Sequence, residues 1–424
     1  MLNRPFAAFA ALLALSSACA GRTGGSGASA APDSLRIRRD IEFLASDALE
    51  GRGTGTPGID TATAWAARRY AALGLRALTP GYLQRYTARS ALLAHAGGPA
   101  AVEANNVIGY VPGTSPVLRG QLIVIGAHID HLGRSPVSAT DPQAKDAIRN
   151  GADDNASGTA AVLELARLLQ ARPLKRSVLF ANFSGEELGL LGSQYFVDHA
   201  PLPIDSVVAM LNFDMVGRLR DDKVIVYGVA TARELPALLD SANVGIGLTL
   251  RPVGDGFGPS DQSSFYLKNL PVLHFFTDTH LDYHAATDDA DKINAAGEAR
   301  VVALAERVAR GIDALPGRLT FVRGAAPVAT GTRSGSNAYL GSIPDMAGGD
   351  VKGLRLSGVR PGSPADSGGL KAGDIVVELG GKPVEDLQSY SDALYSFKPG
   401  DVVEVVVLRG TERLRLKVKL GSRG

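Results

Sequence analysis

The chain has 424 residues, enough for more than one domain and for a sizeable hydrophobic core. Hydrophobic residues make up 45% of it and charged residues 21%, the composition of an ordinary globular protein. The 44 Lys and Arg residues and 43 Asp and Glu residues leave a formal net charge of +1, which argues against a nucleic-acid-binding protein or one that binds membranes electrostatically.

The first twenty residues (1–20) have the layout of an export signal. Arg4 supplies a positive start, Phe6 to Leu15 is an unbroken apolar run, and small residues precede Cys19. Ala18 to Ala20 fits ordinary signal cleavage, whereas a lipid on Cys19 would make a lipoprotein. Cys19 is the only cysteine and stands where a lipid-carrying cysteine is needed, so we favour the lipoprotein, although Ser16 replaces the usual larger aliphatic residue. We expect an exported bacterial protein, periplasmic or anchored in the cell envelope.

Patterned sequence follows a Gly-, Ser- and Ala-rich stretch, residues 21–34, which predicts a flexible tether. Short apolar runs typical of buried strands then alternate with longer helical patterns. The runs cover 121–127, 177–183, 207–213, 224–228 and 271–276, and the helical patterns cover 60–73, 157–170 and 298–315. This alternation predicts an α/β domain over residues 35–320 with a largely parallel central sheet.

The composition changes after this domain. Residues 321–337 are rich in small and turn residues and predict a linker. Strand-like runs at 375–379 and 402–408, with a helical pattern at 387–395, predict a small second domain over 338–421.

Polar residues cluster where the predicted strands end, which is where open α/β sheets bind ligands. His128 and Asp130 close the first run, and alternation along a strand would put both on one face, with Asp130 accepting the second ring N–H of His128. The alternative is a surface His–Asp pair. Asp153, Asp154 and Asn155 precede a predicted helix. Capping that helix needs only one of these three residues. A second role, as a carboxylate that bridges two metal ions, would explain why the segment has more than one.

Two adjacent glutamates, Glu186 and Glu187, follow the second run. Ser184 and Glu187 also have the spacing of a capping box, so helix capping is an alternative. In a buried site the two carboxylates would raise each other's pKa. A cation would relieve one of them and leave the other as a base.

Two further segments complete the pattern. Asp214 ends the run 207–213, and His284 follows the run 271–276, with His274 and His280 as rivals that spacing does not separate. Together the segments offer imidazole nitrogens and carboxylate oxygens, a ligand mixture that suits zinc. The chain has no G-x-S-x-G motif and no cysteine in its body, so a serine or cysteine nucleophile has no support.

Residues 35 to about 315 resemble the M28 family of zinc peptidases, which includes bacterial aminopeptidases. The matching stretches occur in the family's order: EGRGTGTPG (50–58), NNVIGYVPG (105–113), AHIDHLG (127–133), NGADDNASG (150–158), FSGEELGLLGS (183–193), LNFDMVGR (211–218), SDQSSFY (260–266) and DYHAATDDADKI (282–293). The resemblance implies the zinc-peptidase fold, a three-layer α/β/α arrangement around a mostly parallel mixed sheet.

The resemblance also implies roles for single residues. His128 and Asp214 would bind one Zn2+, Glu187 and His284 a second, and Asp154 would bridge both, with a cis peptide bond possible after it. Asp130 would support the site, Glu186 would be the general base, and Tyr283 would hydrogen-bond the oxyanion. Gln262 and the pair Ala285-Ala286 depart from the family's usual residues, which puts substrate fit in doubt.

The implied reaction is hydrolysis of peptide bonds by a water that two zinc ions activate, with release of N-terminal amino acids. A carboxypeptidase, a dipeptidase or a glutaminyl cyclase of the same fold is an alternative, as is a scaffold protein with an inactive peptidase domain.

The second domain resembles a bacterial PDZ domain through GVRPGSPADSGGLKAGDIVVELGGKPV (358–384). Tyr339, Leu340, Gly341 and Ser342 fit its carboxylate-binding loop. The resemblance implies that the domain binds a protein or peptide C-terminus as an added edge strand. A purely structural cap is the alternative.

Overall fold

The computed structural model describes residues 1–2, 31–90, 92–93, 98–141, 143–254, 256, 258, 260–323, 338–344, 352–359, 362–385 and 387–422. Cys19 with nearly all of the predicted export signal, most of the predicted tether and most of the predicted linker lie outside the described residues. These three interpretations stay predictions.

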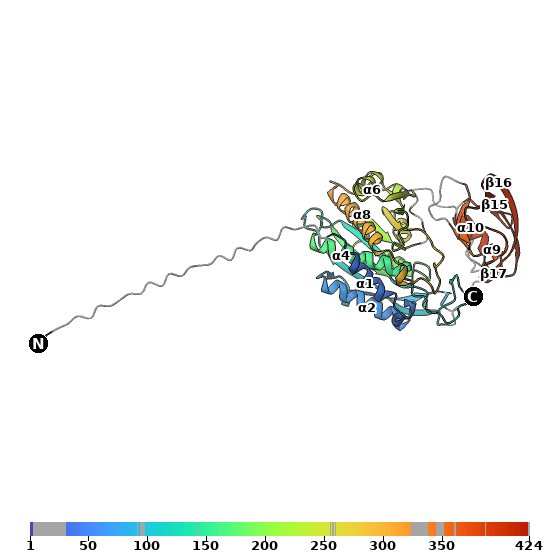
Figure 1. Ribbon diagram of the computed structural model, residues 1–424. Coiled ribbons are helices and arrows are strands. Elements are labelled where there is room, and N and C mark those ends of the chain that lie inside the picture. Colours follow the sequence, from blue (N-terminus) through green and yellow to red (C-terminus); the bar gives the residue numbers. More distant parts are fainter. Residues whose placement is uncertain are drawn as a thin grey trace. The chain divides into compact units, whose positions relative to one another are not determined.

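A mixed sheet forms the centre of the first domain and has nine strands within the described residues (Figure 1). Its order is β1-β3-β5-β4-β6-β9-β7-β8, and β2 pairs with β3. The strands are β1 (Arg76–Ala77), β2 (Leu83–Arg89), β3 (Ala101–Val111), β4 (Leu122–His128), β5 (Ser177–Phe183), β6 (Val207–Phe213), β7 (Lys223–Tyr227), β8 (Thr249–Pro252) and β9 (Val272–Phe276). The central strands β5, β4, β6 and β9 are parallel to one another, so their carboxyl ends meet at one edge.

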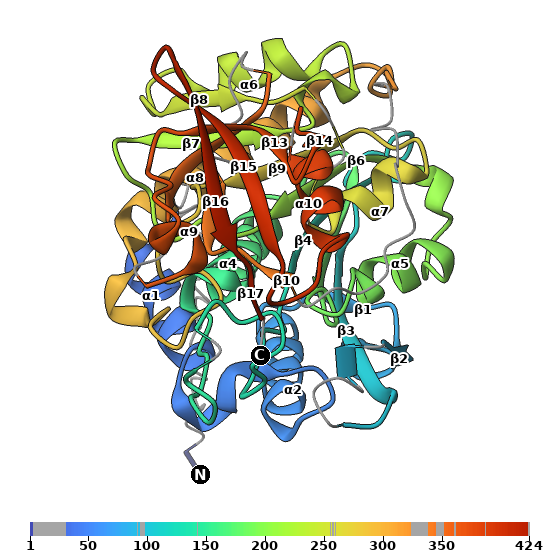
Figure 2. The ribbon, with the colours of Figure 1, turned by 90° about the vertical axis from the view of Figure 1, so that its right-hand side faces the viewer.

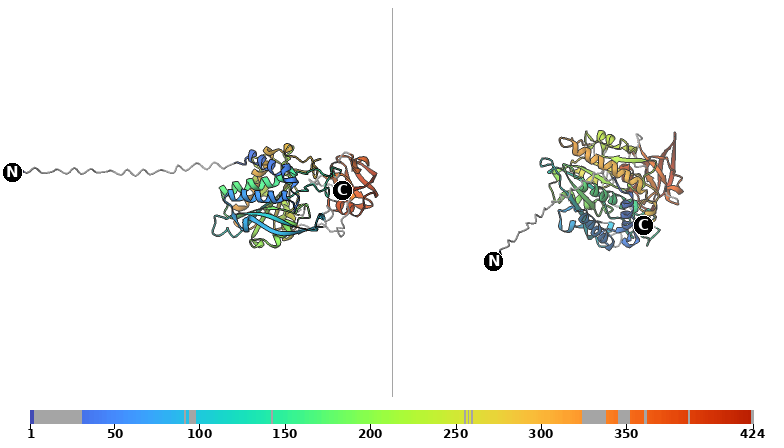
Figure 3. Two further views of the ribbon diagram at one scale, coloured as in Figure 1. Left: turned by 90° about the horizontal axis from the view of Figure 1, so that it is seen from below. Right: turned by 60° about the vertical axis from the view of Figure 1, so that its left-hand side comes forward.

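Helices cover both faces of this sheet. One layer holds α1 (Ser34–Leu44), α2 (Pro57–Ala72), α4 (Gly158–Ala171) and α8 (Ala295–Ala314), with α6 (Leu235–Asn243) packed against α8. In this layer α1 and α4 lie side by side (Figures 1 and 3). The other layer holds α5 (Leu191–Asp198) and α7 (Gln262–Leu267), which contact each other (Figure 2). The predicted three-layer α/β/α fold is therefore confirmed.

The alternation of side chains along the strands explains the two layers. In β4, Ile123 and Ile125 join the core under α4, whereas Leu122 and Val124 join the core under α5 and α7. All four are at least 97% buried, and full burial of each such side chain contributes about 1.5–3 kcal/mol. A strand with two buried faces reads as a continuous apolar run, as the sequence shows here.

The second domain is built from short antiparallel strands. Its main sheet has the order β11-β12-β13-β15-β16, with β14 paired to β13, and β10 pairs with β17. The strands are β10 (Ala338–Tyr339), β11 (Ser342–Pro344), β12 (Leu354–Val359), β13 (Ile375–Leu379), β14 (Lys382–Pro383), β15 (Val402–Arg409), β16 (Glu412–Lys419) and β17 (Gly421–Ser422). Two helices, α9 (Pro364–Ser367) and α10 (Leu387–Tyr395), complete it around a separate hydrophobic core.

None of the helices in the described part of the chain combines the length and the apolar character that crossing a membrane requires.

Candidate metal centre

The carboxyl ends of β4, β5, β6 and β9 bring potential metal ligands together from five segments. Within the described residues, two groups place their ligand atoms within 4.8 Å of one another. The first group is His128, Asp154 and Asp214, and the second is His131, Asp154, Glu187 and His284. Asp154 belongs to both, so the five residues that the sequence proposes as ligands lie at one place, together with a sixth, His131.

Asp154 stands between the two groups. Its Oδ1 lies 3.3 Å from Nε2 of His128, and its Oδ2 lies 3.0 Å from Nε2 of His284. Asp153 is turned away, because its Oδ1 accepts from the backbone N–H of Gly217 at 2.7 Å and its Oδ2 lies 3.1 Å from Nε2 of His280. The geometry therefore selects Asp154 over Asp153 as the carboxylate shared by the two groups.

Local backbone contacts hold Asp154 in this position. The N–H groups of Asp153 and Asp154 donate to Oδ2 of Asp288 at 2.9 and 3.0 Å. Gly151 has a φ of +58°, and a Cβ on it would meet the carbonyl oxygen of Asp154 at 2.1 Å, so only glycine fits there. The peptide bond between Asp154 and Asn155 is cis.

The two predicted histidine ligands have their rings fixed in the same way. Nδ1 of His128 lies 3.1 Å from the carbonyl oxygen of Asp130, and Nδ1 of His284 lies 2.9 Å from that of Ser138. A carbonyl can only accept, so Nδ1 carries a hydrogen, and Nε2 is the ring nitrogen that can offer a lone pair to a metal ion. This arrangement is typical of imidazoles that bind metal through Nε2.

Each Nε2 atom faces a carboxylate besides Asp154. Nε2 of His128 lies 3.5 Å from Oδ1 of Asp214, and Nε2 of His284 lies 3.1 Å from Oε2 of Glu187. The rival His274 is on β9 and interacts with Asn212, and burial lowers its pKa to about 3. Neither His274 nor His280 joins the two groups, so the structure separates the three histidines that spacing left open.

Asp130 contacts His128 in a different way from the one expected. Its carboxylate lies 3.7 Å from Nδ1 of His128, beyond hydrogen-bond range, and its backbone carbonyl accepts instead. The reason is that β4 ends at His128, so the alternation of a strand no longer applies to Asp130. The carboxylate accepts from Oγ1 of Thr54 at 2.9 Å and from the backbone N–H of Glu186 at 3.2 Å.

The two adjacent glutamates have opposite electrostatic environments. Desolvation raises the pKa of Glu186 well above its usual value, and the neighbouring charges of Glu187 and Asp214 raise it further. Burial would also raise the pKa of Glu187, but interactions with His284 and His131 outweigh it and lower that pKa to about 2. The first helix after them, α5, begins only at Leu191, so the capping-box alternative for Glu187 is wrong.

Tyr283 lies directly against the site. Its ring stacks on that of His284 with centroids 3.9 Å apart and an interplanar angle of 24°. Burial raises the pKa of Tyr283 well above its usual value, and the charges of Asp154 and Glu187 add to this. Tyr283 therefore keeps its hydroxyl proton near neutral pH and can act as a hydrogen-bond donor.

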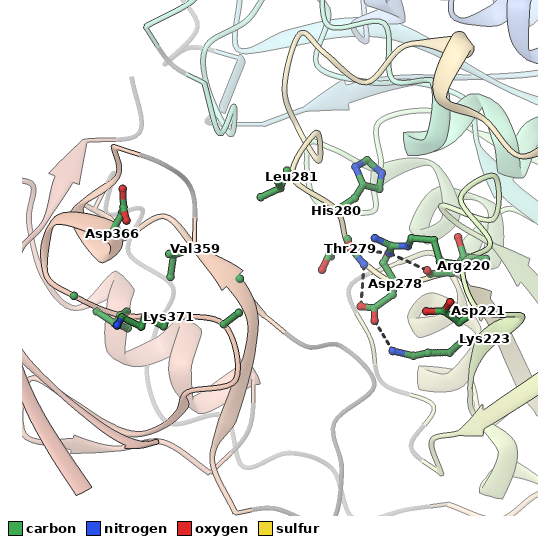
Figure 4. Close-up of a pocket in the computed structure, with 15 residues that line it drawn as sticks. Arg220, Asp221, Lys223, Asp278, Thr279, His280, Leu281, Val359, Asp366 and Lys371 are labelled. Atoms are coloured by element: carbon green, nitrogen blue, oxygen red, sulfur yellow. Dashed lines mark hydrogen bonds and ion pairs between the residues drawn. The ribbon is translucent and has the colours of Figure 1, made fainter. Parts of the chain in front are cut away.

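The segment that leads from β9 to His284 is anchored by polar contacts (Figure 4). Nζ of Lys223 lies 2.7 Å from Oδ2 of Asp278, whose Oδ1 accepts from the backbone N–H of Thr279 at 2.9 Å. Arg220 donates to the carbonyl oxygen of Thr279 at 2.9 Å. These contacts fix the start of the segment that presents His280, Tyr283 and His284.

Three residues of the site region were missed by reasoning from the sequence: Arg52, Thr54 and His131. Arg52 is fully buried and donates to the carbonyl oxygens of Leu44, Ile129, Asn150 and Gly151 at 2.5–2.9 Å. It thus ties the loop that follows His128 to the segment that leads into Asp154. The motifs EGRGTGTPG and AHIDHLG contain these three residues, and the match of both motifs to the family's pattern is the signal in the sequence that points to them.

The donor set fits a pair of zinc ions. Two imidazoles point their Nε2 atoms into the site, and oxygens of three carboxylates lie 3.0–3.5 Å from these atoms. Nitrogen and oxygen donors with one shared carboxylate are an arrangement that zinc accepts.

Both domains match models of known families. The model of Peptidase family M28 matches residues 106–309, and that of the PDZ domain matches residues 338–420. Aminopeptidase YwaD of Bacillus subtilis is 34% identical over 113 residues, which are 26% of this chain and 22% of that protein. Leucine aminopeptidase 2 of Trichophyton equinum is 30% identical over 166 residues, 37% of this chain and 30% of that protein. The matches span less than half the length of either relative.

Solved structures share the fold of the first domain. A leucine aminopeptidase precursor from Bacteroides thetaiotaomicron superimposes with a TM-score of 0.55 at 17% identity, over 66% of this chain and 98% of that one. A Zn-dependent exopeptidase from Parabacteroides distasonis gives a TM-score of 0.55 at 16% identity, over 66% and 99% of the two chains. The sequence match, the fold and the two ligand groups lead to one conclusion: this chain carries a domain of peptidase family M28, followed by a PDZ domain.

Proposed function

We propose that this protein is a zinc-dependent aminopeptidase that uses two metal ions to release N-terminal amino acids from peptides. The observation that carries the proposal is the placement of Asp154, whose two oxygens face two different groups of ligands. Glu186 stands beside these groups but belongs to neither. Two of the relatives, from Bacillus subtilis and Trichophyton equinum, are named as aminopeptidases, and this supports the choice of reaction.

Five side chains would hold the metal ions. His128 and Asp214 would bind one ion, Glu187 and His284 the other, and Asp154 both. When bound, two zinc ions supply a Lewis acid for the scissile carbonyl and lower the pKa of a water molecule. The remaining steps belong to side chains that bind no metal.

Glu186 is suited to move the proton. Its pKa is raised by desolvation, so its carboxylate can take a proton from the attacking water and pass it to the leaving amine. Asp130 fixes the backbone of Glu186 through the 3.2 Å hydrogen bond. Tyr283 keeps its proton and would donate a hydrogen bond to the negative oxygen that develops on the substrate carbonyl.

The test is an assay of the purified protein on aminoacyl substrates with a free or an N-acetylated amine, each with and without a chelator. An aminopeptidase cleaves the free form, loses activity with chelator and regains it with zinc. Equal cleavage of both forms would exclude an aminopeptidase, and hydrolysis of N-blocked peptides from the C-terminus would indicate a carboxypeptidase. Activity that survives metal removal would exclude the metal mechanism.

For the PDZ domain, we propose that it binds the C-terminus of a peptide through residues 339–342. The loop has the backbone this requires: Gly341 has a φ of +82°, and a Cβ on it would meet Cβ of Ser363 at 2.3 Å. The carbonyl oxygen of Leu340 accepts from the N–H of Ala365 at 2.8 Å, so helix α9 supports the loop. Within the described residues β11 pairs only with β12, so its other edge can accept a peptide strand.

Fluorescence anisotropy with a library of labelled peptides tests this binding. Peptides with a free C-terminal carboxylate should bind, their C-terminal amides should not, and Gly341→Val should abolish binding. Equal binding of acids and amides would contradict the role of residues 339–342.

A further inference from the structure

His131 is buried in the metal centre but is not one of the five predicted ligands. It lies in AHIDHLG and is only 1% exposed. Its Nδ1 lies 2.8 Å from Oε1 of Glu187 and 3.8 Å from Oδ2 of Asp154. Gly151 leaves room for the ring, because a Cβ there would meet the ring atoms at 2.5 Å.

The ring of His131 is oriented opposite to those of His128 and His284. Those two point Nε2 at the carboxylates and donate Nδ1–H to backbone carbonyls. His131 points Nδ1 at a carboxylate, and its buried Nε2 has no hydrogen-bond partner among the described residues. A metal-bound imidazole usually donates its other ring N–H to an acceptor, and His131 has no acceptor for an Nε2–H.

The hydrogen of the ring is therefore on Nδ1. The 2.8 Å separation is that of a charge-assisted hydrogen bond, and an ionised carboxylate can only accept. A carboxylate that binds a metal ion is ionised, so Glu187, taken as a ligand, can only accept this hydrogen bond. With Nδ1 donating, Nε2 holds a lone pair, and no buried N–H is left without an acceptor.

We propose that His131 is a positioning residue that donates from Nδ1 to Oε1 of Glu187, so that Glu187 offers a single oxygen, Oε2, to the metal ion it shares with His284. This inference rests on the proposed function, because it takes Glu187 as a metal ligand. Oε2 of Glu187 already lies 3.1 Å from Nε2 of His284, as two ligands of one ion would.

The motif AHIDHLG (127–133) thereby gives the two adjacent glutamates different contacts. The carboxylate of Asp130 accepts from the backbone N–H of Glu186, and the next residue, His131, holds the side chain of Glu187. Glu186 keeps its side chain available as a base, and Glu187 is held as a ligand. The contacts of Asp130 and His131 thus account for the division of roles between two residues that are identical in type and adjacent in sequence.

Two substitutions separate a positioning role from direct metal binding. In His131→Leu no donor remains. In His131→Asn the amide nitrogen Nδ2 is bonded to Cγ, as Nδ1 of histidine is, so it can donate to Oε1 of Glu187, but an amide nitrogen is no zinc ligand. The matched control is His199→Leu, which removes an exposed histidine of the same domain.

The experiment measures the dissociation constants of Zn2+ by titration against a chromophoric chelator for the metal-free full-length protein and the three variants. We expect His131→Leu to bind one of the two ions about 10–100-fold more weakly, as loss of a hydrogen bond to a ligand does elsewhere. His131→Asn should bind both within a few-fold of wild type, and His199→Leu should equal wild type. Equal weakening in the Leu and Asn variants, or none in the Leu variant, would overturn the inference.

A second measurement needs no variant. X-ray absorption of the zinc-loaded wild type should count two imidazole ligands per pair of metal ions, from His128 and His284. Three imidazoles would show that His131 binds metal itself and would overturn the inference while leaving the proposed function intact. A wild-type protein that binds no zinc would overturn the proposed function and this inference with it.

Discussion

The hydroxyl group of Thr54 donates a 2.9 Å hydrogen bond to Oδ2 of Asp130, and both residues are at least 91% buried. The segment around Thr54 runs beside the segment around Asp130, because Gly53 and His131 form a parallel bridge and the N–H of Gly133 donates to the carbonyl oxygen of Gly51 at 3.0 Å. The other carboxylate oxygen of Asp130 accepts from the backbone of Glu186. Thr54 therefore supports, through Asp130, the backbone of Glu186, the proposed general base.

Thr54→Val should disturb this support without changing the size of the side chain. The buried oxygen of Asp130 loses its donor, which costs about 1–3 kcal/mol of unfolding free energy. We expect kcat to fall more than KM changes, because Glu186 shifts and substrate contacts stay. Urea unfolding and steady-state kinetics measure both effects. Thr54→Ser, which keeps the hydroxyl group, is the control, and wild-type kinetics in the valine variant would exclude this role.

The two neighbouring glutamates should give different defects when each is replaced by glutamine. Glu186→Gln removes the base and should lower turnover about 10²–10⁴-fold while both zinc ions stay bound. Glu187→Gln should lose about one of the two zinc ions. Metal content by mass spectrometry and kcat on a free aminoacyl substrate distinguish them. Loss of zinc from the Glu186 variant would contradict the division of roles.

The shared position of Asp154 predicts a thermal effect. Zinc at 100 times its dissociation constant should stabilise the metal-free protein by about 2.7 kcal/mol per site and raise Tm. Asp154→Asn should abolish most of this rise, because the residue contacts both groups. Asp153→Asn is the control, since Asp153 contacts Gly217 and His280 instead. Differential scanning calorimetry measures the zinc-induced rise in Tm of the two variants. Equal rises in both would refute the role of Asp154 as the bridging ligand.

Asp40 in α1 should make stability depend on pH. Burial raises its pKa from 3.8 to about 6, even though Arg69 lies 2.7 Å away and opposes the shift. Between these values the unfolded chain has lost the proton that the folded chain keeps, so the contribution of Asp40 to stability falls as pH rises from about 4 to 6. In Asp40→Asn this pH-dependent fall is absent. Between pH 4 and 7 the unfolding free energy of the variant should therefore rise by up to about 3 kcal/mol relative to that of the wild type. Urea unfolding at several pH values measures this. A difference in unfolding free energy between variant and wild type that does not change with pH would contradict the raised pKa of Asp40.

The N-terminal segment yields a prediction about location. We propose that the protein is exported and carries a lipid on Cys19. Cys19→Ser should move the protein from the membrane fraction to the soluble envelope fraction of the producing bacterium, with unchanged peptidase activity. Cell fractionation with an immunoblot reads this out. A wild-type protein in the soluble envelope fraction would favour ordinary cleavage after Ala20.

The sequence pattern by itself predicted an α/β domain with a largely parallel central sheet, but it did not predict the strands β1, β2, β3 and β8. Apolar runs such as 121–127 and 207–213 are typical of strands buried on both faces, and they correspond to β4 and β6. The runs also placed His128, Asp130, Glu186, Glu187 and Asp214 at strand ends. Because parallel strands share one carboxyl edge, chain order and strand ends together implied that these residues meet.

Only the tertiary structure decided which atoms meet. It chose His284 over His274 and His280, gave the two oxygens of Asp154 to different groups, and replaced the expected carboxylate of Asp130 by its carbonyl oxygen. It also revealed that Thr54 and His131 support the two glutamates. The physical reason is that a hydrogen bond depends on distances of a few tenths of an ångström and on direction, between segments far apart in the chain. Periodicity fixes which residues share a strand end, but the packing of the loops that follow fixes where each oxygen and nitrogen points.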